Sequence, residues 1–263
     1  MVWLYSRPMG LLVVGCLAIA AVVAIVARLA VRALVPDDER EAAAAVAAPL
    51  MPALGAAFAI LAALTLANEA NSLSAAQAIV STEAAAASRL AWAATTPGID
   101  TVPIHDSLRA YLDATRTSEW HDDAAADGTD AATATALASL ERTVREDAAQ
   151  SGVGTPTSTE LLASLDALTT GRRDRLAAAS RQLPGLYVIT LAVAGIALIA
   201  NAGVLTIRVR RRTALIVGGL ATVIGLSMAL LFAIGAPWRG PVGVSTRPID
   251  AIVSDLDSGY FHP

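Results

Sequence analysis

Three polar side chains stand at the end of the second long apolar stretch of the sequence, where a helix would leave a membrane. Thr65, Asn68 and Ser72 are spaced three and then four residues apart, so they share one face of a helix. Their hydroxyl and amide groups can donate hydrogen bonds to an anion. The spacing predicts a pore-lining stripe, and the alternative is an ordinary solvated helix exit.

A second pattern on the same stretch places small residues at every fourth position. Gly55, Ala59, Ala63 and Ala67 form a ridge along a helix. Small side chains let helix backbones approach closely in lipid, where packing replaces the hydrophobic effect. The ridge therefore predicts a close helix contact. That contact would line a pore, join subunits or pack helices within one subunit, and the alanine-rich composition favours the last.

The composition excludes several kinds of active site. All 19 basic residues are arginine, so neither a lysine Schiff base nor a Walker-type phosphate lysine is available. The single cysteine, Cys16, cannot form an internal disulfide, and three histidines are too few for a structural zinc site. His121 follows Glu119 and Trp120, but adjacent residues at a helix end point in different directions and rarely converge on one ion. We expect no catalytic residue, no metal and no cofactor.

These residues must be positioned by membrane helices, because 55% of the chain is hydrophobic and only 16% is charged. Stretches of about 20 apolar residues can cross the hydrocarbon core. None of them contains Asp, Glu or His, which argues against proton-coupled transport. The four expected spans are 9–27, 49–67, 186–207 and 213–236.

The spans occur in two pairs, which predicts an all-α integral membrane protein with four transmembrane helices in two hairpins and an inserted extramembrane helical bundle. The expected domains are a first hairpin at 1–67, a bundle at 68–183, a second hairpin at 184–236 and a polar C-terminal tail at 237–263.

The inserted bundle is acidic and helical in pattern. Residues 70–182 carry nine Arg against fifteen Asp and Glu, and this net charge of −6 disfavours nucleic acid as a partner. Only Gly55 interrupts the stretch from 53 to 95, so the first bundle helix should continue the second span. The last bundle helix should open at Thr157, whose spacing to Glu160 fits a capping box.

The short loops between paired spans carry a high density of arginine. Such loops stay in the cytoplasm, which places the bundle and both termini outside the cell in a multi-pass plasma-membrane protein. These arginines are Arg28, Arg32 and Arg40 in the first loop, and Arg208, Arg210, Arg211 and Arg212 in the second. Each basic residue near an anionic lipid surface contributes about 1 kcal/mol of attraction, so the four arginines of the second loop would also bind the bilayer.

Several short motifs in order resemble the bacterial bestrophin-like domain over roughly residues 35–255. They are Gly55 in the second span, Glu83-Ala84 on the long helix, Glu119-Trp120 at the end of a short helix, Arg172, Arg173, Arg175 and Leu176, Leu183-Pro184 before the third span, and Pro237 and Gly240 after the last. The chain departs from that pattern at Leu66-Ala67-Asn68 and at His121, where the family usually has an aromatic residue and a proline.

Bestrophins proper are oligomeric anion channels, so the resemblance implies a channel-like architecture. It also implies a sidedness opposite to the one that the arginines indicate. The leading hypothesis is a bestrophin-like oligomeric anion channel in a lipid bilayer. The alternative is a non-conducting accessory subunit of a larger membrane assembly.

Overall fold

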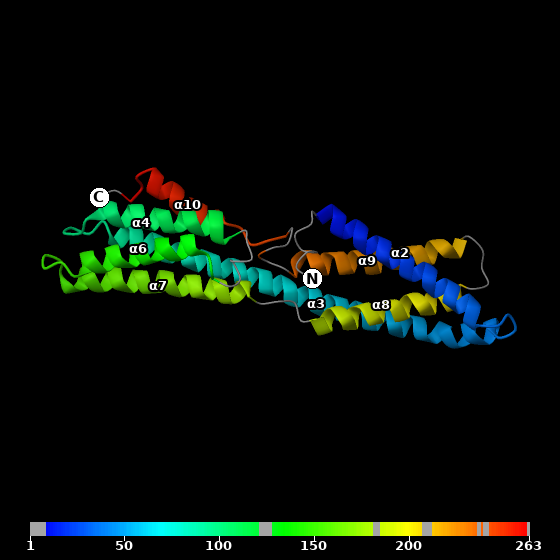
Figure 1. The fold of residues 1–263 in the computed structure, drawn as a ribbon. Helices are drawn as coiled ribbons and strands as arrows, with labels where there is room; N and C mark the ends of the chain where they lie inside the picture. Colours follow the sequence, from blue (N-terminus) through cyan, green and yellow to red (C-terminus); the bar gives the residue numbers. More distant parts are fainter. Residues whose placement is uncertain are drawn as a thin grey trace. The chain divides into compact units, whose positions relative to one another are not determined.

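The computed structural model describes residues 9–120, 128–180, 185–206, 212–235, 238 and 242–261, and every regular element in these ranges is a helix (Figure 1). The helices are α2 (Met9–Leu34), α3 (Arg40–Ala93), α4 (Thr101–Ala114), the π-helical turn η1 (Thr115–Glu119), α6 (Ala131–Ala148), α7 (Thr155–Ala179), α8 (Gly185–Leu205), α9 (Arg212–Ile234) and α10 (Arg247–Asp257).

Four of these helices are long and apolar enough to cross a membrane. The chain divides into two compact units, which we call the span unit and the bundle unit. The span unit comprises Met1–Asn71 and Gln182–Val242, and the bundle unit comprises Ser72–Arg181 and Gly243–Pro263. Both units contain part of α3, a helix of 54 residues that would be about 80 Å long at 1.5 Å per residue.

The span unit has an aliphatic core to which α2, α3, α8 and α9 all contribute. Glycines set the closest approaches between these helices. A side chain at Gly225 of α9 would lie 3.1 Å from the Cys16 carbonyl oxygen of α2. Asn201, the strongly polar residue of the third span, donates its amide to the Ala47 carbonyl of α3 at 3.1 Å, which satisfies a polar group inside an apolar core.

The bundle unit has a core of leucine and other aliphatic residues from the second part of α3 and from α4, α6 and α7. Its fully buried members include Leu90, Ile104, Leu108, Leu112, Leu140, Val144, Leu161 and Leu168. The expected capping box at the start of α7 is wrong. The helix begins at Thr155 with Gly154 as its N-cap, and Glu160 instead forms an ion pair with Arg89.

The C-terminal segment, expected to be a polar tail, contains an amphipathic helix that packs on α4 of the bundle unit. Ile249, Ile252 and Val253 of α10 are buried, which gives the helix an apolar side for this contact. After α10, the buried Phe261 ring meets Trp92 edge-on at 5.3 Å. The polar composition of the tail gave no sign of this short helix, because apolar residues make up only one side of the helix.

Candidate functional site

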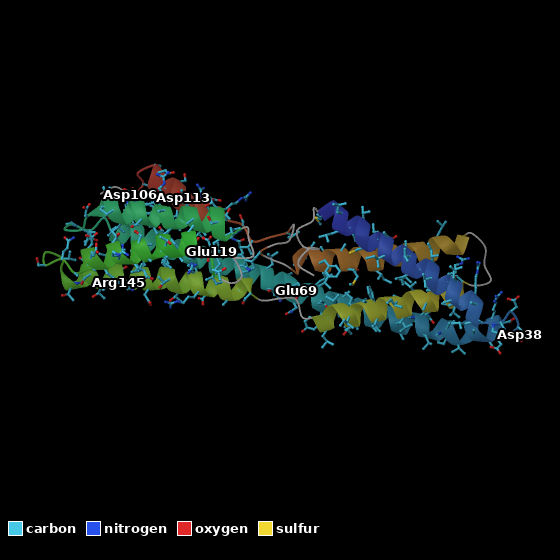
Figure 2. All side chains as sticks on the ribbon, in the orientation of Figure 1. Asp38, Glu69, Asp106, Asp113, Glu119 and Arg145 are labelled. Atoms are coloured by element: carbon cyan, nitrogen blue, oxygen red, sulfur yellow. The ribbon has the colours of Figure 1, made fainter. Side chains whose placement is uncertain are left out.

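In the span unit, α3 has one buried face and one exposed face. Phe58, Ala62, Thr65 and Glu69 follow one another at helical spacing and are all buried. Asn68 stands about 100° round the helix from Glu69 and is exposed. Figure 2 labels Glu69 on this helix. The acidic side chain therefore does not share the exposed face.

The structure separates the three residues of the predicted polar stripe. Thr65 is only 7% exposed, and its hydroxyl donates to the Leu61 carbonyl of its own helix at 2.7 Å. Asn68 is exposed in the span unit, and Ser72 is half-buried in the bundle unit. The spacing alone could not tell which side of a broad polar face would be covered. Asn68 is the side chain of the three whose donor groups are most open to a ligand.

The exposed face of α3 instead carries a different stripe. Ile60 and Leu64 are 59% and 65% exposed, and Asn68 follows after a further four residues. Residues four apart lie above one another on a helix, so the apolar side chains of Ile60 and Leu64 are followed on the same face by the amide of Asn68. We call Ile60, Leu64 and Asn68 the exposed stripe.

The ridge of small residues lies beside this stripe and is uncovered. Ala59, Ala63 and Ala67 are exposed, and a side chain placed on Gly55 would have no neighbour within 4 Å. Packing within one subunit, the interpretation that the composition favoured, does not account for this exposure in the part of the chain that is described. The predicted helix contact of this ridge stays a prediction.

The outer faces of the span helices differ in character. The exposed surface of α2 is dominated by bulky aliphatic residues, among them Leu11, Val14, Ile19, Val22, Ile25, Val26 and Leu29. α8 exposes Leu186, Ile189, Val193 and Ile196 in the same way. On α3 the matching surface is mainly alanine, and small residues are typical of helix contacts in membranes. α3 also exposes the bulky residues Val46, Leu50, Ile60 and Leu64, so its outer face is distinguished by the exposed alanines beside Ile60 and Leu64.

The bundle unit contains a buried network of charged side chains, and Figure 2 labels one of its members, Glu119. The Arg175 guanidinium contacts both carboxylates, with Nε at 2.6 Å from Glu83 Oε2 and Nη2 at 3.1 Å from Glu119 Oε2. Arg172 donates from Nη2 to Glu119 Oε1 at 2.9 Å. The Tyr111 hydroxyl donates to Glu83 Oε1 at 2.6 Å. Two carboxylates and two guanidinium groups thus neutralise one another.

Burial and charge decide the protonation of this network. Loss of water and the neighbouring Glu83 carboxylate raise the pKa of the Tyr111 hydroxyl well above its usual range, so Tyr111 stays a neutral donor. Burial alone would lower the pKa of Arg175, but the charge and hydrogen bonds of Glu83 outweigh it and raise that pKa. The Trp120 ring lies 5.6 Å from the Arg175 guanidinium carbon, which adds a cation–π contact.

A glycine lets the two longest helices of the bundle unit meet at this network. A side chain at Gly171 of α7 would lie 3.0 Å from the Glu83 Cα of α3, closer than ordinary packing allows. The sequence contained a signal for this arrangement, because Arg172 and Arg175 continue the leucine stripe through Leu165 and Leu168. Arginines on an otherwise apolar face need buried partners. The sequence motifs that contain these residues did not predict that Glu83, Glu119 and the two arginines would meet.

Some predicted residues lie outside the described part of the chain. This holds for Arg208, Arg210, Arg211 and His121. Arg212 begins α9, but its side chain is not described. Their proposed roles in topology and lipid binding stay predictions. Within the described ranges, no three His, Cys, Asp or Glu side chains are grouped so that they could hold a metal ion.

Comparison with known proteins identifies the family. The sequence matches the family model of the Bestrophin-like domain over residues 18–249. The chain belongs to the bestrophin-like family. Its fold is similar to that of a mutated bacterial bestrophin homologue from Klebsiella pneumoniae, with a TM-score of 0.70 and 13% sequence identity, over 93% of this chain and 98% of that one. No curated protein matches the sequence.

Proposed function

We propose that this bestrophin-like protein assembles as a homo-oligomer around an anion-conducting pore, and that α3 supplies both the subunit contact and the pore lining. The observation that carries the proposal is the outer face of α3. Its alanine ridge is uncovered, whereas α2 and α8 present bulky aliphatic surfaces. A face of small residues in lipid is suited to close contact with a second copy of the helix.

The exposed stripe supports anion passage in such an assembly. Ile60 and Leu64 would surround a narrow apolar section that gates by dewetting, and Asn68 would offer amide donors at its mouth. Glu69 is buried on the other face of α3, so its carboxylate would not form a ring that repels anions.

The membrane layout belongs to the same proposal. The spans α2 with α3 and α8 with α9 form two hairpins, with the bundle inserted between them. We place the bundle and both termini outside the plasma membrane, on the arginine density of the short loops. A Ser139→Cys variant in a Cys16→Ser background tests this, because Ser139 is exposed on α6. Labelling of intact cells by an impermeant thiol reagent is expected, and protection would place the bundle in the cytoplasm.

Chloride efflux from liposomes containing the purified full chain tests conduction, combined with the mass of the assembly in mild detergent. A symmetric homo-oligomer that releases chloride supports the proposal. A stable complex with unrelated membrane subunits and no efflux would overturn it in favour of the accessory-subunit alternative. Efflux from liposomes that lack the protein sets the background.

A further inference from the structure

A groove of about 540 Å³ separates parts of α2 and α9 within the span unit. Its walls are apolar and mostly small, and they include Leu17, Ala21, Ala24 and Ile25 of α2 and Gly218 and Gly219 of α9. Both helices are membrane-span candidates, so the groove faces the hydrocarbon of the bilayer wherever protein does not cover it. A chain of methylene groups is the natural filling for such a space.

Three glycines of α9 explain why the groove exists. At Gly225 the two helices are in close contact, because an added Cβ would lie 3.1 Å from the Cys16 carbonyl oxygen. Two turns earlier, an added Cβ at Gly218 or Gly219 would have no neighbour within 4 Å. The helices therefore separate from a tight crossing toward the start of α9. The missing side chains at these two positions leave the space open.

One charged side chain lines the groove at its wider end. Arg28 stands eleven residues after Leu17, about 16 Å along α2 at 1.5 Å per residue, and is half-buried. Within the described ranges its guanidinium forms no ion pair with a carboxylate. The described part of α9 begins three residues before the groove residue Leu215, so the groove lies against the first turns of this helix.

We propose that the groove holds an acyl chain of an anionic phospholipid whose headgroup phosphate binds Arg28. Apolar walls match the acyl chain, and the half-buried guanidinium matches the phosphate. α2 continues for six residues beyond Arg28, which puts this charge near the end of the span, where long side chains reach lipid headgroups. The site is independent of conduction and would be occupied whether or not the assembly passes ions.

Thermal unfolding of the purified full chain with added phosphatidylglycerol or phosphatidylcholine of the same acyl composition tests the proposal, and native mass spectrometry counts the bound lipids. Phosphatidylglycerol is expected to raise the unfolding midpoint by about 2–4 °C more than phosphatidylcholine. Arg28→Gln should remove most of that difference. Arg32→Gln is the matched control, because Arg32 lies one turn further along α2, is exposed and does not line the groove.

A second variant fills the groove itself. Gly218→Leu combined with Gly219→Leu should remove the bound lipid and its stabilising effect, while Gly15→Leu should retain both, since Gly15 also has open space at its Cβ but lies outside the groove. Glycerol 3-phosphate alone should produce no shift, because the acyl chain supplies the apolar contact.

Equal shifts with both lipids in the unmodified protein would overturn the proposal. So would a loss of preference in Arg32→Gln equal to that in Arg28→Gln, or bound lipid that survives the groove-filling substitutions. If those substitutions reduce the mass of the assembly, the groove holds a second copy of the chain and the proposal is wrong.

Discussion

The bundle unit and the span unit differ in whether they cover particular alanines of α3, the helix that both contain. In the bundle unit, Ala87 and Ala91 of α3 are completely buried. In the span unit, Ala59 and Ala63 of α3 are exposed, although the residue type and the spacing are the same. The contrast concerns position rather than residue type, because Ala62 of the span unit is buried and Ala85 of the bundle unit is exposed. The helices of the bundle unit cover Ala87 and Ala91, whereas no described helix covers Ala59 and Ala63 in the span unit.

The two units also differ in how their buried charged side chains are paired. The bundle unit encloses Arg175, Glu83 and Glu119 with at most 1% of each side chain exposed. Buried charges that are paired and hydrogen-bonded hold helices in one arrangement, and removal of a single partner leaves an uncompensated charge. In the span unit the half-buried Arg28 has no carboxylate partner among the described residues. A self-sufficient unit and one that depends on its surroundings should respond differently to substitution.

The largest effect is expected from Arg175→Met in the bundle unit. It leaves the Glu83 carboxylate buried without its guanidinium partner and should lower the free energy of unfolding by about 3–5 kcal/mol. Urea unfolding followed by tryptophan fluorescence measures this loss. Arg173→Met is the control, because Arg173 is exposed and its replacement should change stability by less than about 0.5 kcal/mol. Equal losses in the two variants would show that the network does not hold the bundle together.

Replacing one glycine in each unit by alanine compares how tightly the two units are packed. Gly171→Ala would force a Cβ to within 3.0 Å of the Glu83 Cα and should cost about 1–3 kcal/mol. Gly55→Ala meets no atom of its own chain within 4 Å and should not destabilise the subunit. Thermal unfolding of both variants in detergent measures the difference. A larger loss in Gly55→Ala would mean that the span unit is packed as completely as the bundle unit.

Ala63→Leu tests the uncovered ridge. Overpacking of a close subunit contact should weaken the assembly by about 1–3 kcal/mol per contact, without unfolding the subunit. Mass photometry over a range of concentrations gives the dissociation of the assembly. Ala18→Leu is the matched control on the exposed surface of α2. An assembly of unchanged mass and stability in Ala63→Leu would show that the ridge faces lipid.

The smallest effect concerns a helix cap. The Asp130 carboxylate accepts a hydrogen bond from the Thr133 backbone amide at 2.7 Å, and Asp130→Ala should cost about 1 kcal/mol. Bonds to Thr133 lower the pKa of Asp130, so its contribution is present above the pKa of the unfolded chain and is lost as the pH falls through the lower folded-state pKa. Unfolding measured from neutral to acidic pH should show the two proteins converging. Asp106→Ala is the control at an exposed position of α4, and it should change the stability at neutral pH by less than about 0.5 kcal/mol.

The sequence predicted the membrane helices well, because apolar stretches of sufficient length have few alternative structures. It could not show which side of α3 would be covered, since that depends on helices distant in the chain. Thr65 and Asn68 therefore looked equivalent, although one is buried and the other exposed. The meeting of Glu83 with Arg175 joins residues 92 positions apart, a pairing that local periodicity does not encode.

The central claim is that the exposed stripe of α3 lines an anion pathway. The reversal potential of the reconstituted protein under a chloride gradient tests it most directly, with Asn68→Asp compared with Thr82→Asp, which adds the same charge at an exposed position of α3 in the bundle unit. We predict a wild-type reversal potential close to the chloride equilibrium value, a shift away from it in Asn68→Asp and a much smaller one in Thr82→Asp. Absence of current, or a chloride-selective current unchanged by Asn68→Asp, would contradict this account of the pore.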